Sequence, residues 1–153
     1  MVREQFKKIP EGLTIYDYYF DLKKDKEFKP WADEVPEFVY DKETPYFDLV
    51  VATQETVLYS FMVESFLAIE KPLFFTGASG IGKSLIISKT LAQLKEHGNI
   101  MPININMSAL TSSARTQQSI EEKLEKKKRT LYGAQPGKKI AIFVDDINMP
   151  SVE

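Results

Sequence analysis

The sequence contains no cysteine and only one histidine, and it lacks a large excess of charge of either sign. Without cysteine there is neither a disulfide framework nor a thiolate metal site, which fits a reducing compartment without requiring one. The 20 basic and 22 acidic residues leave a net charge of −2. No overall field therefore attracts the chain to polyanions, and we expect no nucleic-acid partner and no membrane partner.

Long apolar runs are absent as well. No stretch approaches the roughly 20 apolar residues of a membrane helix, and the start of the chain, Met1 to Lys8, has no apolar core of signal-peptide length. The sequence has 153 residues, of which 43% are hydrophobic, and this is enough for one domain with a real core. We therefore expect a globular protein located in the cytoplasm.

Residues 1–47 form an aromatic-rich segment, and composition changes after it. Tyr16, Tyr18, Phe20 and Leu22 alternate with polar positions, as in a strand with two different faces. Lys23 to Lys26 offers a polar turn before Phe28 and Trp31, so we predict a β-hairpin. The aromatic side chains are expected to serve as core and not as a ligand cage.

Residues 48–153 alternate between helical and strand patterns, which indicates an α/β fold with a parallel sheet. The pattern predicts helices from Thr53 to near Glu70, from Ser84 to Gly98, and from Ser112 or Ser113 to about Leu131. It predicts strands at Leu73–Thr76, Ile103–Met107 and Ile140–Val144, with a turn at Gln135-Pro136-Gly137 before the third.

A basic run, Lys126 to Arg129, falls at the end of the third expected helix. The pairs Glu122 with Lys126 and Glu125 with Arg129 have the four-residue spacing that stabilises a helix. We therefore interpret the run as a solvated helix end and not as a nucleic-acid patch.

A glycine-rich loop between the first strand of this region and the next helix has the pattern of a phosphate-binding loop. Backbone amides that converge at the start of a helix can hold a triphosphate, and glycine allows the close approach that this needs. Lys83 is expected to reach the β- and γ-phosphate oxygens, and the Ser84 hydroxyl to bind Mg²⁺. The sequence thus predicts binding of ATP or ADP with Mg²⁺ by residues Gly77, Ala78, Ser79, Gly80, Ile81, Gly82, Lys83, Ser84 and the adjoining Leu85.

Two adjacent acids, Asp145 and Asp146, end the apolar strand downstream of this loop. An acid at the carboxyl end of such a strand faces the same crevice as the loop, so Asp145 is the expected magnesium partner of Ser84. Asp146 is the candidate catalytic residue, because hydrolysing P-loop proteins of the strand-catalytic class usually carry glutamate there. Aspartate would place its carboxylate roughly 1 Å short, which can cost about 10²-fold in rate. Slow turnover and a backbone adjustment that restores the geometry both stay open.

Four stretches of the sequence resemble the third AAA+ module of axonemal dynein heavy chains, and residues 16–46 look like the segment that precedes that module. The last stretch, in which paired aspartates are followed by Ile-Asn-Met-Pro, is more specific than the phosphate loop. The four stretches are residues 53–60, 71–77, 112–117 and 143–150.

The resemblance implies a P-loop NTPase of the AAA+ type, with three α/β/α layers, inside a microtubule motor of the ciliary or flagellar axoneme. The third module is thought to regulate such a motor more than to power it. Implied partners are other AAA+ modules of the same heavy chain and, through the parent protein, microtubules and dynein intermediate and light chains. Val50, Val51 and Thr53 match the family segment that packs near the adenine.

The AAA+ sheet has the strand order five, one, four, three, two, and this sequence stops just after strand three, the Walker B strand. Strands four and five, the sensor residues and the helical lid are missing from the pattern. We therefore expect a fragment of a very long polypeptide that is marginally folded alone, because the phosphate-loop strand would lack both of its neighbours.

Two other functions stay open at this point. A small stand-alone P-loop phosphotransferase would need an arginine-rich lid, and after Lys83 the chain has only Arg115 and Arg129. A non-hydrolysing module that is locked by bound nucleotide would need no catalytic acid, which Asp146 allows.

Overall fold

The computed structural model describes residues 14–21, 27–40, 49, 51–98 and 100–151. By its internal contacts the chain divides into two compact units, Met1–Met62 and Val63–Glu153. The boundary predicted from composition, after residue 47, lies inside the first unit. Among the described residues, no helix combines the length and the apolar character needed to cross a bilayer.

The first unit contains the predicted β-hairpin. Strand β1 (Tyr18–Phe20) pairs antiparallel with β2 (Phe28–Pro30), with Tyr19 opposite Lys29. Short 3-10 helices, η1 (Ile15–Asp17) and η2 (Trp31–Glu34), adjoin the two strands. The hairpin prediction is therefore confirmed, although its expected turn at Lys23 to Lys26 and the preceding Leu22 lie outside the described residues.

Aromatic side chains form the core of this unit, as the sequence predicts. The Trp31 side chain is only 6% exposed. Its ring lies 4.6 Å from that of Tyr19 and 5.3 Å from that of Phe61, measured between centroids. Such tilted and edge-on pairs contribute beyond the area that they bury. The hairpin is thus held to the first half of the helix that carries Phe61.

Helix α2 (Gln54–Ala68) begins and ends close to the predicted positions. The Thr53 hydroxyl accepts a hydrogen bond from the Thr56 amide at 3.3 Å, which caps the first turn. After the helix, Glu70 has a left-handed φ of 56°. The amides of Glu70 and Lys71 donate back to the carbonyls of Leu67 and Phe66 at 3.1 and 2.9 Å, which is a Schellman termination.

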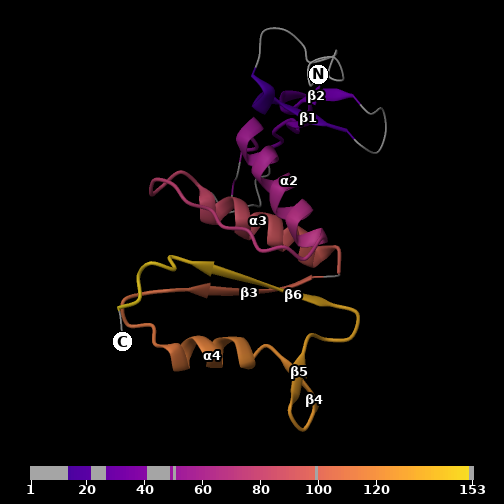
Figure 1. Ribbon diagram of the computed structural model, residues 1–153. Helices are drawn as coiled ribbons and strands as arrows, with labels where there is room; N and C mark the ends of the chain where they lie inside the picture. The colour runs from indigo at the N-terminus through magenta and orange to yellow at the C-terminus, as the bar shows by residue number, and fades with distance from the viewer. Residues whose placement is uncertain (1–13, 22–26, 41–48, 50, 99, 152–153) are drawn as a thin grey trace, which may run out of the picture. The chain divides into compact units, whose positions relative to one another are not determined.

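The second unit has three layers, as expected for this fold class (Figure 1). Strands β3 (Ile100–Asn106) and β6 (Lys139–Asp145) pair in parallel, in a register that runs from Ile100 opposite Lys139 to Asn106 opposite Asp145. Helix α3 (Lys83–Glu96) lies on one side of the pair and α4 (Ser113–Glu121) on the other. Leu91 of α3, Ile103 and Ile105 of β3, and Ala141 of β6 are buried between the layers.

The predicted strand at Leu73–Thr76 is wrong. These residues form no regular element, and the Phe74 side chain is 74% exposed instead of buried. A strand needs a neighbour to take its backbone hydrogen bonds. The sheets among the described residues have two strands each, and none of them includes this segment.

The predicted helix to Leu131 is wrong in its second half. Helix α4 ends at Glu121, and β4 (Glu125–Lys128) and β5 (Leu131–Gly133) then form an antiparallel hairpin. The two expected helical charge pairs are absent for this reason. Each pair would have contributed only about 0.2–0.5 kcal/mol to the helix. The basic run also places like charges at helical spacing, and their repulsion would destabilise the helix.

The turn into β6 has the predicted form. Gly137 adopts a φ of +77°, and the Lys138 amide donates to the Gln135 carbonyl at 3.0 Å.

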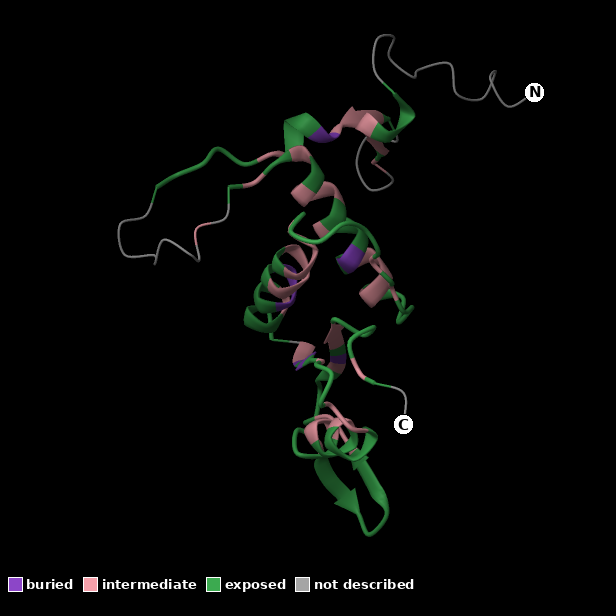
Figure 2. Cartoon of the chain, turned by 90° about the vertical axis from the view of Figure 1, so that its left-hand side faces the viewer, coloured by how far each residue is buried: buried purple, intermediate pink, exposed green. Residues whose placement is uncertain are grey.

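Outside this turn, an ion pair joins Lys139 of β6 to Glu70, with Nζ and Oε1 2.7 Å apart and both side chains exposed. The β4–β5 hairpin before the turn is fully exposed along β4 (Figure 2).

Candidate functional site

The glycine-rich loop enters α3 through left-handed backbone. Gly80 and Gly82 have φ values of +80° and +87°, which side-chain-bearing residues rarely adopt. Gly77 serves a different purpose, because a Cβ added there would lie 3.0 Å from the Ile81 Cδ1 atom. The loop therefore needs glycine for conformation at two positions and for space at a third.

The amino terminus of α3 presents free backbone donors. The first helical hydrogen bond runs from the Ile86 amide to the Gly82 carbonyl at 3.0 Å, and no side chain in the described part of the chain caps the helix. The amides of residues 83–85 precede that bond and have no acceptor within the helix. Together with the positive end of the helix dipole, they form a place where an anion is favoured.

Lys83 is folded over the loop. Its ammonium group donates hydrogen bonds to the carbonyls of Gly77 at 3.1 Å and Ala78 at 2.6 Å. This places a positive charge above the same backbone that would surround a phosphate group. A bound polyphosphate would offer charged oxygen acceptors in place of these two neutral carbonyls.

Ser84 and Asp145 meet as the sequence predicts. The Ser84 hydroxyl, in the first turn of α3, donates to the Asp145 Oδ1 atom at 2.9 Å. Asp145 is the last residue of β6, and its carbonyl accepts from the Met107 amide at 3.1 Å, just past the end of β3. The paired strands therefore fix the carboxylate against the phosphate loop.

This donor set fits Mg²⁺. A hydroxyl and a carboxylate are the hard oxygen ligands that Mg²⁺ accepts, and it usually takes its remaining ligands from phosphate and water. Among the described residues there is no cluster of three or more His, Cys, Asp or Glu that could form an all-protein metal cage. Ser84 and Asp145 thus suit an ion that arrives with a nucleotide.

Asp146 lies beside this pair in a strained backbone conformation. Its φ is +53°, in the left-handed region where aspartate is tolerated better than most residues. Its amide donates to the Asp145 Oδ1 atom at 3.1 Å, and its carbonyl accepts from the Met149 amide at 2.9 Å. The residue is exposed, so its carboxylate is free of the packing that would fix one orientation.

A cavity of about 910 Å³ joins these groups. Its lining combines Gly77, Lys83 and Ser84 of the loop and helix and the two acids with apolar side chains. A volume of this size lies in the range of small-molecule sites, which combine apolar walls with a few polar groups. The apolar wall includes Val63, Leu67, Leu91 and Phe143.

The sequence does not identify this apolar wall as part of a site, because the helical spacing of Val63 and Leu67 equally fits an ordinary core. Lys71 and Asn148 also line the cavity and were not predicted as site residues. Asn148 belongs to the motif after the paired acids, which is the signal that could have singled it out. Lys71 begins the matching stretch 71–77, but nothing in that stretch marks it as a residue that lines a site.

The three predicted adenine contacts lie outside the described second unit, and their role stays a prediction. Val50 lies outside the described residues, whereas Val51 and Thr53 are exposed and belong to the first unit. Within the second unit, the side chains of Ile81 and Leu85 are 59% and 48% exposed, and neither residue is among those that line the cavity.

Comparison with known proteins gives a consistent result. The profile of the family described as "P-loop containing dynein motor region" matches residues 38–153. Dynein axonemal heavy chain 6 of Homo sapiens is 39% identical over 146 residues, which are 95% of this chain and 4% of that protein. Dynein axonemal heavy chain 9 of Homo sapiens (37%) and the ciliary dynein beta chain of Heliocidaris crassispina (36%) match over the same length and share of this chain, which is 3% of each protein.

Proposed function

The chain belongs to the family of P-loop containing dynein motor regions, and on this basis we propose that it binds ATP or ADP together with Mg²⁺ as one AAA+ module of a dynein heavy chain. The observation that carries the proposal is the 2.9 Å contact between the Ser84 hydroxyl and the Asp145 carboxylate. It joins two segments 61 residues apart in the chain at the mouth of the phosphate loop. A glycine turn without a binding role would not be expected to place a hydroxyl against the carboxylate of a distant strand.

Each group has a definite role in this proposal. The amides of residues 77–85 surround the phosphates, and Lys83 exchanges its two carbonyl partners for phosphate oxygens. Ser84 and Asp145 hold the metal ion, which would neutralise charge on the β- and γ-phosphates. The apolar side chains that line the cavity would exclude water from part of the nucleotide.

Asp146 supports a regulatory site more than a fast hydrolytic one. A general base must hold its carboxylate within hydrogen-bonding distance of the attacking water. Here the side chain is short, exposed and attached to left-handed backbone. We propose that nucleotide binding is tight and turnover slow, and a module that holds nucleotide without hydrolysing it is the second candidate favoured by the same observation.

At the level of the whole protein we propose the third AAA+ module of an axonemal heavy chain. The chain spans only 3–4% of the length of the three relatives described above, so microtubule movement, contacts with intermediate and light chains, and a place in the ciliary axoneme are proposals about a parent protein. Their support is the names of these relatives and the four matching sequence stretches. The neighbouring AAA+ modules would be this chain's direct partners.

The test is an equilibrium titration with a fluorescent ATP analogue, with and without Mg²⁺. The variant Lys83→Ala should abolish binding, because it removes the cation over the loop. Lys89→Ala is the matched control, since Lys89 is exposed on the same helix and does not line the cavity. Equal affinity of the wild type and Lys83→Ala, with the helical circular-dichroism signal unchanged, would overturn the proposal.

Turnover is tested separately, by phosphate release from a dynein motor domain that contains this sequence. Little release would agree with a regulatory site. Release as fast as that of a main hydrolytic module would mean that Asp146 works as a base in spite of its geometry.

A further inference from the structure

The β4–β5 hairpin ends in a two-residue tip, Arg129 and Thr130, that follows a run of lysines. We propose that Thr130 is a phosphorylation site for a serine/threonine kinase that selects basic residues before the acceptor. Nothing in the nucleotide site requires this hairpin. The proposal therefore stands independently of the function proposed above.

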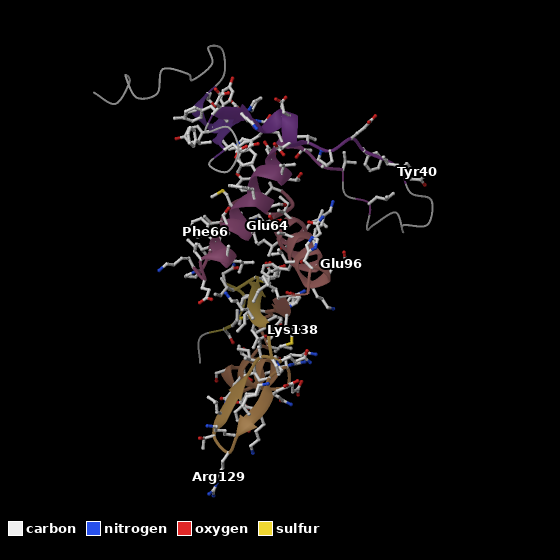
Figure 3. The ribbon with its side chains drawn as sticks, turned by 90° about the vertical axis from the view of Figure 1, so that its right-hand side faces the viewer. Tyr40, Glu64, Phe66, Glu96, Arg129 and Lys138 are labelled. Carbon is white, nitrogen blue, oxygen red and sulfur yellow. The ribbon has the colours of Figure 1, made fainter. Side chains whose placement is uncertain are left out.

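The acceptor is accessible. Every residue from Glu125 to Tyr132 is exposed (Figure 2). Arg129 points away from the rest of the hairpin at its end (Figure 3). The Thr130 hydroxyl makes no hydrogen bond to any residue that the structure describes. A modifying enzyme would therefore displace no contact of the acceptor side chain.

The charges before the acceptor are the second observation. Lys126, Lys127, Lys128 and Arg129 occupy the four positions immediately before Thr130. Only Lys127 is neutralised, by Glu125 at 2.8 Å, and among the described residues the other three have no carboxylate partner. Kinases choose substrates by charge pattern along the segment, so a substrate groove lined with carboxylates would match this run.

The hairpin can open at low cost. A two-stranded ribbon without a packed face is marginally stable in water. Here β4 is exposed throughout and the pairing with β5 shifts between Lys126 and Lys128. Exposed segments with few buried contacts lie at the low end of local unfolding free energies, so residues 126–131 can straighten to enter a groove without disturbing β3 and β6.

Another threonine in the same unit makes a useful contrast. Thr116 also follows an arginine, Arg115, but it lies inside α4 and its hydroxyl donates to the Ser112 carbonyl at 3.1 Å. Only one of the four residues before it is basic. A kinase that needs an extended basic segment should therefore choose Thr130 and not Thr116.

In the transfer step the Thr130 Oγ1 atom forms a bond to the γ-phosphorus of ATP, and the bond from that phosphorus to the β,γ-bridging oxygen breaks. ADP leaves with the bridging oxygen, and the hydroxyl proton passes to the base of the kinase. The product carries about −1.5 to −2 charges within reach of the basic run. Phosphorylation would therefore remove most of the positive character of the hairpin.

The test incubates the chain with labelled ATP and two sets of purified serine/threonine kinases, one selecting basic and one selecting acidic residues before the acceptor. We expect the basic-selecting kinases alone to label the chain, with peptide mass spectrometry placing the phosphate on Thr130. Thr130→Ala should reduce labelling at least about tenfold and Thr116→Ala should leave it unchanged. The double variant Lys127→Glu/Lys128→Glu, which keeps the acceptor, should also reduce labelling.

Two controls separate this labelling from any phosphate transfer by the chain's own nucleotide site. One omits the kinase, and the other uses the Lys83→Ala variant as the substrate. Brief trypsin treatment reports accessibility independently, and first cleavage should fall within residues 126–129. Labelling that persists in Thr130→Ala, that is equal with both sets of kinases, or that maps to another residue would overturn the proposal.

Discussion

Replacing Gly82 by alanine should harm both stability and nucleotide binding, whereas replacing Gly98 should harm stability alone. The two glycines flank the same helix, α3, with nearly equal φ values of +87° and +91°. A Cβ atom added at either position would have no heavy atom within 4 Å. The cost of each substitution is therefore a backbone cost without a steric clash, and Gly98→Ala is a matched control for Gly82→Ala.

The expected magnitude follows from the left-handed conformation. A residue with a Cβ loses roughly 1–2 kcal/mol there, and the lower entropy of the unfolded alanine chain offsets about 0.4–1 kcal/mol of this loss. We expect each variant to lose about 1 kcal/mol of unfolding free energy. For a chain of this size that is about 2–4 °C in the melting temperature.

Urea unfolding followed by circular dichroism measures the stability, and titration with the fluorescent ATP analogue measures the affinity. Gly82→Ala should also weaken binding, because relaxation of the strained turn would rotate the amides of the first α3 turn away from the phosphate. If Gly98→Ala weakens binding as much as Gly82→Ala does, the loop geometry is not what holds the nucleotide. If neither variant loses stability, the left-handed conformations themselves are refuted.

Three further predictions concern other contacts. Asp145→Asn keeps a partner for the Ser84 hydroxyl but removes the charge, so it should abolish the Mg²⁺-dependent part of ATP affinity. The expected loss of affinity is about tenfold or more, for a contact of about 1.5–3 kcal/mol. Asp146→Asn should leave this part of the affinity unchanged, and equal effects would contradict the assignment of Asp145 as the metal ligand. The hydrogen bond from the Tyr19 hydroxyl to Glu34 raises the pKa of Tyr19 to about 12. Absorbance at 295 nm should show a tyrosine that ionises this late, and Glu34→Gln should bring its pKa back toward 10. The stability that this hydrogen bond contributes below pH 10 should disappear as pH rises through 12. The hydrogen bond from Lys139 lowers the pKa of Glu70, so this pair should stabilise the chain above the ordinary glutamate pKa and cease to do so as pH falls through the lowered value; NMR titration of the Glu70 carboxyl should show the shift disappear in Lys139→Ala, and an unchanged titration would refute the pairing.

Local signals predicted the elements that depend on few distant contacts. Glycine at a left-handed turn, a hydroxyl before a helix and an apolar run ending in acids all act over a few residues, so α2, α3 and β6 fall close to their predicted positions. The meeting of Ser84 with Asp145 was also predictable, because an acid at the carboxyl end of a strand in an α/β sheet faces the crevice at which a phosphate loop lies.

The elements that the sequence did not predict depend on whether a strand finds a neighbouring strand to pair with. Leu73–Thr76 has the composition of a buried strand, but no strand among the described residues pairs with it in a sheet. The segment after Glu121 has helical charge spacing, but like charges and weak pair energies let a hairpin form instead. The left-handed conformation of Asp146 has no sequence signal beyond the known tolerance of aspartate for it.

The pairing of β3 with β6 also explains what two consecutive aspartates can achieve. Asn106 stands opposite Asp145, and a slip of β6 by one residue would reverse the face of every side chain along the strand. Most sites would lose their key group in such a slip. Here Asp146 would move into the place that Asp145 now holds, with its carboxylate toward Ser84. The doubled acid thus keeps a carboxylate opposite Asn106 when β6 slips in this direction, whereas a slip in the other direction would bring Val144 there.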